Sequence, residues 1–167
     1  ANNLLGSVLD YSRESDGLQI CDLAMVVEGC QRLVAKKLEY RNIGIQFHCS
    51  GQALVAASSS DMHQVVLNLL GNAHDALVDS PQAEKAIVVF LQTAEDGKIS
   101  LAVENNGPVI PLAAVERIFE RHYSTKGEQG SGIGLFVCRK LLKNNSGDIA
   151  VESSALKTVF TMVLPAA

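Results

Sequence analysis

A polar stripe runs along one side of a helix that the sequence predicts at residues 61–78. Gln64, Asn68, Asn72 and Asp75 follow one another at intervals of three or four residues, so they share one helix face. Most of the other positions are apolar, which is typical of a buried helix. Buried amides need polar partners, and a neutral amide oxygen is a suitable ligand for Mg²⁺ beside phosphates. The stripe indicates either a pocket of this kind or an amphipathic helix whose polar face lies in water.

A glycine-rich segment, Gly130–Leu135, lies at the start of a second predicted helix, 132–145. Glycines there let the backbone approach a ligand closely, and the free amides and dipole of a helix N-terminus bind phosphate. The segment has neither the Walker A pattern nor the dinucleotide GxGxxG spacing, and a flexible turn with close helix packing is the alternative. Lys126, in the polar stretch just before it, is either a phosphate ligand or a solvated surface lysine.

A third polar segment, Asn105–Pro111, follows a predicted strand. Gly107 permits a positive φ angle, and the two prolines stiffen the loop. An asparagine side chain carries both a donor and an acceptor, so Asn105 at the end of a buried strand can recognise the edge of a base. A tight turn rich in asparagine is the alternative for this segment.

The composition bounds the class of protein. The chain has 167 residues, enough for one domain with a full core, and 47% are hydrophobic, but only 5% are aromatic, so we expect an aliphatic core. The net charge is −4 without a basic run, which argues against nucleic acid as a partner. No apolar run approaches the roughly 20 residues of a membrane span. The four cysteines form no CxxC pair, so we expect buried, reduced thiols in a cytoplasmic protein and no zinc site.

The helices and strands predicted around these segments form an α+β pattern. Apolar periodicity and turn residues predict helices at 1–13, 23–41, 61–78, 112–118 and 132–145. The predicted strands are 18–21, 43–49, 53–57, 86–93, 98–104, 148–152 and 158–164. We expect strands 43–49 and 53–57 to form a hairpin across Ser50-Gly51, and all strands to form one sheet with the helices on one face.

Taken together and in this order, the segments resemble the catalytic ATP-binding domain of sensor histidine kinases. The wider superfamily includes type II topoisomerases, the heat-shock 90 chaperones and the mismatch-repair ATPases. Asp61–Leu77 looks like the N box, Asn105–Ile110 like the first glycine box, Ile118–Lys126 like the F box and Gly130–Leu135 like the second glycine box. The resemblance covers roughly residues 18–165. It implies the Bergerat fold, a two-layer α/β sandwich in which three helices cover one face of a mixed, mostly antiparallel sheet.

The resemblance also implies the roles of individual residues. Asn72 would be the Mg²⁺ ligand, and Asn68 would lie beside the metal and its waters, both as catalytic residues. Phe119 would anchor a lid over residues 120–131, Gly107 would shape the adenine pocket, and the glycines of the second box would hold the phosphates. The implied ATP contacts are Asn68, Asn72, Asp75, Asn105, Gly107, Ile110, Phe119, Ser124, Thr125, Lys126, Gly130, Ser131, Gly132, Ile133, Gly134, Leu135 and Thr158.

The sequence departs from the family pattern on the adenine side. The first glycine box normally begins with an Asp that accepts from the adenine amino group, and the aligned residue is Asn105, whose carbonyl oxygen would accept this bond more weakly. The second glycine of that box is Val109, and the usual Pro-Phe of the F box is Arg121-His122. Leu156-Lys157-Thr158 replaces the usual glycine pair before the last strand.

The expected activity is ATP-dependent phosphoryl transfer to a histidine and then to the receiver domain of a response regulator. We expect residues 1–14 to end a dimerisation and phosphoacceptor domain and residues 15–167 to form the ATP-binding domain. No histidine lies where the phosphoacceptor is expected, so we expect this chain to be a fragment of a longer, homodimeric protein. The fragment itself is expected to make no membrane contact, and an anchor elsewhere in the longer protein is left open. Relatives that hydrolyse ATP to water have a Glu base where this chain has Asn68, which favours phosphotransfer over hydrolysis. A non-catalytic binding module of the same fold and a hydrolysing ATPase are the alternatives.

Overall fold

The computed structural model describes residues 19–125, 127 and 130–167. The predicted helix at 1–13, the domain boundary near residue 14 and Lys126 therefore lie outside the described residues. The described helices are α2 (Leu23–Tyr40), α3 (Ser59–Val78), α4 (Leu112–Val115) and α5 (Gly134–Asn144). The strands are β1 (Ile20–Asp22), β2 (Ile43–Ser50), β3 (Leu54–Ala56), β4 (Lys85–Thr93), β5 (Ile99–Asn105), β6 (Asp148–Ser153) and β7 (Thr158–Leu164).

Five of the strands form the main sheet, in the order β2-β4-β5-β7-β6. Strands β2 and β4 run parallel, and every other neighbouring pair in this sheet is antiparallel. The sheet is therefore mixed and mostly antiparallel, as predicted. Alternate residues of β5 and β7 are buried, and these residues project toward the helices.

The predicted hairpin between strands 43–49 and 53–57 is wrong. Gly51 does form a turn, with φ of 84°, but β3 leaves the main sheet and pairs antiparallel with β1. Strand β2 instead pairs parallel with β4, which follows α3 in the chain. A parallel pair needs a long crossover connection, and β3 with α3 supplies it. The expected single sheet is thus a five-stranded sheet plus a two-stranded one.

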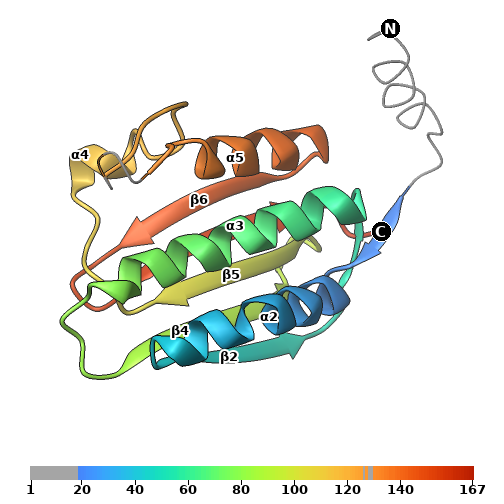
Figure 1. Ribbon diagram of the computed structural model, residues 1–167. Helices are drawn as coiled ribbons and strands as arrows, with labels where there is room; N and C mark the ends of the chain where they lie inside the picture. Colours follow the sequence, from blue (N-terminus) through green and yellow to red (C-terminus); the bar gives the residue numbers. More distant parts are fainter. Residues whose placement is uncertain (1–18, 126, 128–129) are drawn as a thin grey trace, which may run out of the picture.

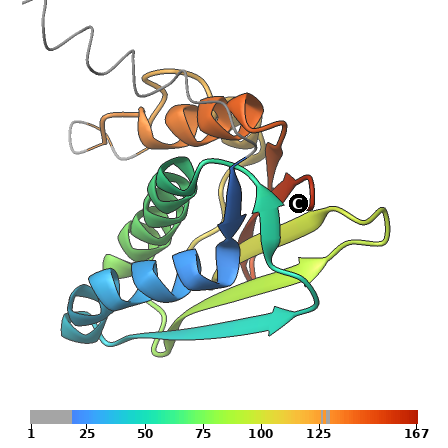
Figure 2. The same ribbon diagram turned by 90° about the vertical axis from the view of Figure 1, so that its right-hand side faces the viewer.

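The helices α2, α3 and α5 lie side by side over one face of the main sheet (Figure 1), and the view turned by 90° shows one helical layer against one sheet layer (Figure 2). The three-helix, two-layer architecture is confirmed. Side chains cap the first two described helices: the Asp22 side chain accepts from Ala24 N–H, and the Ser58 side chain accepts from Asp61 N–H. Helix α4 ends at Val115 and α5 begins at Gly134, so both are shorter than predicted.

The core between the layers is aliphatic, as expected from the composition. Among the described residues, Phe119 and Phe160 are the aromatic side chains that are buried there. All four cysteines are free thiols; Cys21, Cys30 and Cys138 are buried, but Cys49 is exposed on β2, so the expectation of four buried thiols is wrong for that residue. No described helix is long and apolar enough to cross a membrane.

Candidate functional site

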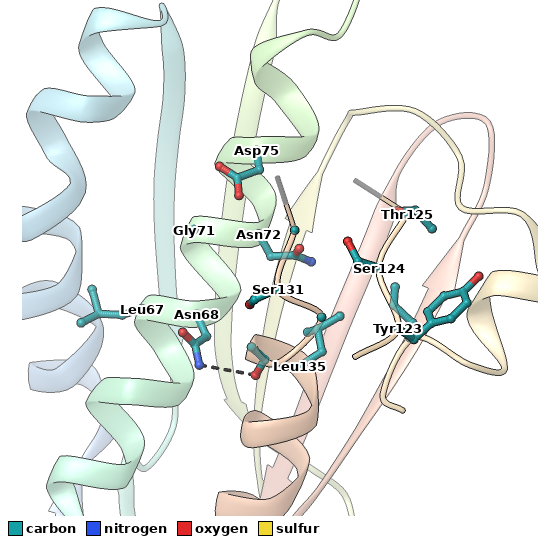
Figure 3. A pocket seen from close by; sticks show the side chains of 14 residues that line it. Leu67, Asn68, Gly71, Asn72, Asp75, Tyr123, Ser124, Thr125, Ser131 and Leu135 are labelled. Atoms are coloured by element: carbon teal, nitrogen blue, oxygen red, sulfur yellow. Dashed lines mark hydrogen bonds between the residues drawn. The ribbon is translucent and has the colours of Figure 1, made fainter. Parts of the chain in front are cut away.

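The polar stripe of α3 forms one wall of a cavity of about 290 Å³. Asn68, Asn72 and Asp75 line this cavity, whereas Gln64 is exposed and does not line it. Figure 3 shows the Asn72 side chain directed from α3 toward the segment that carries Ser124 and Ser131. The functional interpretation of the stripe therefore applies to the C-terminal half of α3 rather than to its full length.

The packing of α5 against α3 explains where the cavity opens. At the C-terminal end of α5, Asn145 Nδ2 donates to the Asp61 carboxylate at 2.9 Å, near the start of α3. Further along, the Cys138 thiol donates to the Val65 carbonyl at 3.8 Å. At the start of α5, Asn68 Nδ2 donates to the Gly134 carbonyl at 3.4 Å. The two helices thus run antiparallel, and the cavity lies beyond the N-terminus of α5, beside Asn72 and Asp75.

The glycine-rich segment forms the opposite wall. Gly130, Ser131, Gly132, Gly134 and Leu135 all line the cavity, as the sequence predicts. Helix α5 begins here with Ile133 at its N-cap, whose apolar side chain makes no capping hydrogen bond to the first amides. The first N–H groups of a helix lack partners within the helix and carry a partial positive charge, so this end of α5 can bind an anion.

A third wall comes from Tyr123, Ser124 and Thr125, which follow the predicted lid anchor. The chain segments 122–125 and 130–132 cross at a backbone contact in which His122 N–H donates to the Gly132 carbonyl at 2.9 Å. Both residues have the left-handed backbone conformation, with φ of 63°. A Cβ atom on residue 132 would lie 2.5 Å from the His122 carbonyl carbon, so only glycine fits at this crossing.

Phe119 anchors this segment from inside the core rather than from the cavity. Its ring is buried and meets the Phe160 ring edge-on at a centroid distance of 6.3 Å. The Arg139 guanidinium lies over the same ring at 4.7 Å. Ile118, the preceding residue, lines the cavity instead.

The residues expected on the adenine side do not line the cavity. Asn105 and Thr158 are buried and face each other across β5 and β7. The Asn105 carbonyl oxygen accepts the Gly107 N–H at 3.0 Å, and the loop after β5 is fixed where Ile110 N–H donates to Ser153 Oγ at 2.8 Å. Gly107 has no positive φ angle; its role is close approach, because a Cβ there would lie 3.2 Å from the Ala76 carbonyl oxygen of α3. Ile133 is half-exposed and also lies outside the cavity wall.

Leu67, Gly71, Ile118 and Tyr123 line the cavity without having been predicted. The sequence held a signal for Gly71, because it lies one turn before Asp75 on the same side of α3. A Cβ on residue 71 would meet nothing within 4 Å, so this glycine leaves the space beside α3 open. His74 was not predicted either; its buried ring contacts the Asp75 carboxylate through Nδ1 at 2.9 Å.

The polar groups of the cavity suit a metal-bound polyphosphate. Among its described lining residues, Asp75 carries the one formally charged side chain, and no lysine or arginine is present. The wall therefore supplies amide oxygens, one carboxylate, hydroxyls and backbone amides. Mg²⁺ is commonly held by one or two protein oxygens together with substrate phosphates and waters, so the donor set around Asn72 fits this ion.

The thiol of Cys138 lies beneath the cavity, on the first turns of α5. Burial raises its pKa to about 11, against a smaller lowering effect from the Asn68 side chain. A thiol with such a pKa stays protonated near neutral pH, so this cysteine is a packing residue rather than a nucleophile.

Comparisons with known proteins show the family to which the chain belongs. Residues 57–167 match the family described as histidine kinase-, DNA gyrase B- and HSP90-like ATPase. The two-component sensor PprA of Pseudomonas aeruginosa is 34% identical over 144 residues, which are 84% of this chain and 16% of that protein. The C4-dicarboxylate transport sensor protein DctB of Rhizobium meliloti is 34% identical over 140 residues, 83% of this chain and 22% of that protein. The chain thus spans less than a quarter of either relative.

Solved structures show the same architecture. The catalytic domain of the histidine kinase ThkA has a TM-score of 0.77 at 27% identity, covering 90% of this chain and 96% of that domain. ThkA in complex with the response regulator protein TrrA has a TM-score of 0.75 at 26% identity, covering 98% of this chain and 46% of the ThkA chain. By its sequence and its fold, this chain belongs to the histidine kinase-, DNA gyrase B- and HSP90-like ATPase family.

Proposed function

We propose that the chain binds Mg-ATP in the cavity between α3, α5 and residues 118–132, and presents the γ-phosphate to a histidine on another domain. The observation that carries the proposal is the meeting of the Asn68–Asn72–Asp75 stripe with the N-terminus of α5 around one cavity. A response regulator would then accept the phosphoryl group, since the related kinase ThkA has been solved in complex with one. The full-length protein would act as a homodimer, with these residues on the cytoplasmic side.

Each wall of the cavity has a distinct role in this proposal. Asn72, with Asp75 one turn further on, would hold Mg²⁺, which when bound neutralises charge on the phosphate oxygens. The first amides of α5 and the backbone of Gly130–Gly134 would orient the terminal phosphates. Ser124 and Ser131 would add hydroxyl donors from the facing segments.

The chemistry of Asn68 favours transfer to a protein over hydrolysis. Its amide cannot take a proton from an attacking water, and its Nδ2 already donates to the Gly134 carbonyl. The chain's contribution is therefore positioning and charge stabilisation, which is how most phosphoryl transfer is catalysed. The attacking nucleophile would be an imidazole supplied from outside this chain.

Calorimetric titration of the chain with Mg-ATP tests the proposal. Asn72→Ala should weaken binding at least about tenfold, as expected for the loss of a bond to a charged group, while the unfolding midpoint without nucleotide stays nearly unchanged. Gln64→Ala is the matched control, because Gln64 shares the helix and the stripe but lies outside the cavity. Absence of binding at millimolar Mg-ATP, or an equal loss in both variants, would refute the proposal.

Two experiments distinguish the proposal from its alternatives. The described wall of the cavity lacks a basic side chain, which is compatible with a binding module that does not transfer phosphate. If this chain phosphorylates a dimerisation and phosphoacceptor domain added to the assay, the non-catalytic binding module is excluded. Steady ADP release by the isolated chain that is lost in Asn72→Ala would favour the hydrolysing ATPase instead.

A further inference from the structure

Asn105 occupies a position where the apolar face of β5 would otherwise continue. Ile99, Leu101 and Val103 alternate along this strand and are buried on the side that α3 covers. Asn105 is the next residue of the series and is only 4% exposed. A buried amide is costly unless its donor and its acceptor are both satisfied, by the protein or by a ligand.

The orientation of the Asn105 amide is fixed by chemistry. The atom that lies 3.0 Å from the Gly107 nitrogen must be the carbonyl oxygen, because a backbone N–H can only donate. The amide nitrogen must then occupy the other branch of the side chain. Among the described residues nothing accepts from Asn105 Nδ2, and this nitrogen is not among the enclosed polar atoms that lack a partner, so it keeps access to solvent.

The surroundings of Asn105 place this donor beside the cavity. Gly107, which holds its oxygen, packs against Ala76, and Ala76 directly follows the cavity residue Asp75. Thr158 lies opposite Asn105 in the sheet, and its hydroxyl is already engaged at 2.6 Å with Ser153 Oγ. Asn105 Nδ2 is therefore the polar group in this cluster that remains available to a ligand seated between the sheet and α3.

An aspartate at position 105 would differ from the asparagine only in the side-chain atom that faces away from Gly107. One carboxylate oxygen would accept the Gly107 N–H, and the other would offer an acceptor to the ligand. The asparagine keeps the oxygen that accepts the Gly107 N–H, but it presents the N–H donors of Nδ2 to the ligand. Position 6 of a purine is a donor in adenine and an acceptor in guanine or hypoxanthine, so an outward donor matches the 6-oxo group and opposes the 6-amino group.

We infer that Asn105 is a specificity-determining residue that shifts nucleotide selectivity from the 6-amino group of adenine toward the 6-oxo group of hypoxanthine and guanine. The inference rests on the proposed function, since it requires a nucleoside triphosphate whose base lies at this end of β5. A matched rather than opposed polar contact in a buried site changes affinity by about tenfold or more.

The test compares dissociation constants for Mg-ATP and Mg-ITP by calorimetry in the chain and in Asn105→Asp. ITP carries the 6-oxo group without the 2-amino group of GTP. Its N1 also carries a proton, but this difference from ATP is the same for the chain and for Asn105→Asp, so the change in the ratio of the two constants reports the contact at position 6. The ratio of the ITP constant to the ATP constant should be about tenfold higher in Asn105→Asp. The ratio cancels the repulsion that the added charge exerts on any triphosphate. Asn106→Asp adds the same charge one residue away. It keeps the acceptor for Ala86 N–H and loses the bond from Asn106 Nδ2 to the Glu84 carbonyl, and it should leave the ratio unchanged.

A second measurement needs no variant and covers the case in which Asn105→Asp does not fold. The unaltered chain should bind ITP more tightly than the triphosphate of purine riboside, which has only hydrogen at position 6, and should bind ATP no more tightly than that compound. Binding of ATP at least tenfold more tightly than ITP, or equal ratios in the chain and Asn105→Asp, overturns the inference but leaves the proposed function standing. If none of the nucleotides binds, both fall.

Discussion

At the level of single residues, the crossing of segments 122–125 and 130–132 depends on Gly132. Replacement by Ala adds a Cβ that would lie 2.5 Å from the His122 carbonyl carbon and 2.7 Å from the Tyr123 oxygen. The 122–123 backbone must move, and with it Tyr123 and Ser124 of the cavity wall. We expect a loss of about 1–3 kcal/mol in unfolding free energy and at least a tenfold loss in Mg-ATP affinity, by denaturant titration and calorimetry.

Gly97→Ala is the control for that variant. Gly97 has φ of 79°, so an alanine there carries a comparable backbone penalty, but a Cβ would meet no atom within 4 Å. It should destabilise by about 1 kcal/mol and leave nucleotide affinity unchanged. If both variants lost affinity equally, the crossing at Gly132 would have no role in the site.

The residue types and spacing predicted part of the site for a physical reason. Helical periodicity places Asn68, Asn72 and Asp75 on one face, and these residues do share a cavity. The same periodicity could not exclude Gln64, because what separates it from the cavity is the point where α5 begins opposite Asn68. Nor could residue type tell which atom of Asn105 faces outward, since that depends on a backbone N–H two residues later.

At the scale of elements, α3 carries a glycine in its middle that keeps the cavity open. A mid-helix glycine costs about 0.5–1 kcal/mol relative to alanine. Since a Cβ at residue 71 would meet nothing within 4 Å, Gly71→Ala should stabilise the chain by about that amount. Gly71→Leu should fold as well but fill the space between Asn68 and Asp75, and so abolish binding of Mg-ATP (Figure 3). Equal nucleotide affinity in the Ala and Leu variants would contradict this role.

The elements themselves were predicted better than their pairing. Turn residues and period-2 alternation predicted all seven strands, including β2 and β3, to within a few residues. The turn at Gly51 suggested a hairpin, because a short polar loop between two strands is normally one. The pairing was decided by longer-range contacts instead: Gly51 packs on the Thr93 hydroxyl, and β3 is held by β1 and by the C-terminal residues around Ala166. Such contacts leave no local pattern in the sequence.

At the scale of the whole molecule, the aliphatic core encloses thiols whose protons couple folding to pH. Burial raises the pKa of Cys30 and of Cys138 to about 11, and burial also raises the pKa of Cys21. In the unfolded chain these thiols ionise near their ordinary pKa of about 8.5. Between about pH 8.5 and 11 the folded state therefore holds more protons than the unfolded state, and the unfolding free energy must fall as pH rises.

This coupling predicts the shape of a measured curve. The urea midpoint should be level from about pH 7 to about pH 8 and decline from about pH 8.5 to about pH 10.5. Lysines and tyrosines titrate over the same range, so the absolute slope does not isolate the thiols. A Cys30→Ala, Cys138→Ala double variant removes two of the titrating groups, and although it starts from a lower midpoint, its decline with pH should be shallower. Parallel curves for the two proteins would mean that the thiols near α3 reach solvent in the folded state, and hence that α2 and α5 do not pack on it as tightly as the structure shows.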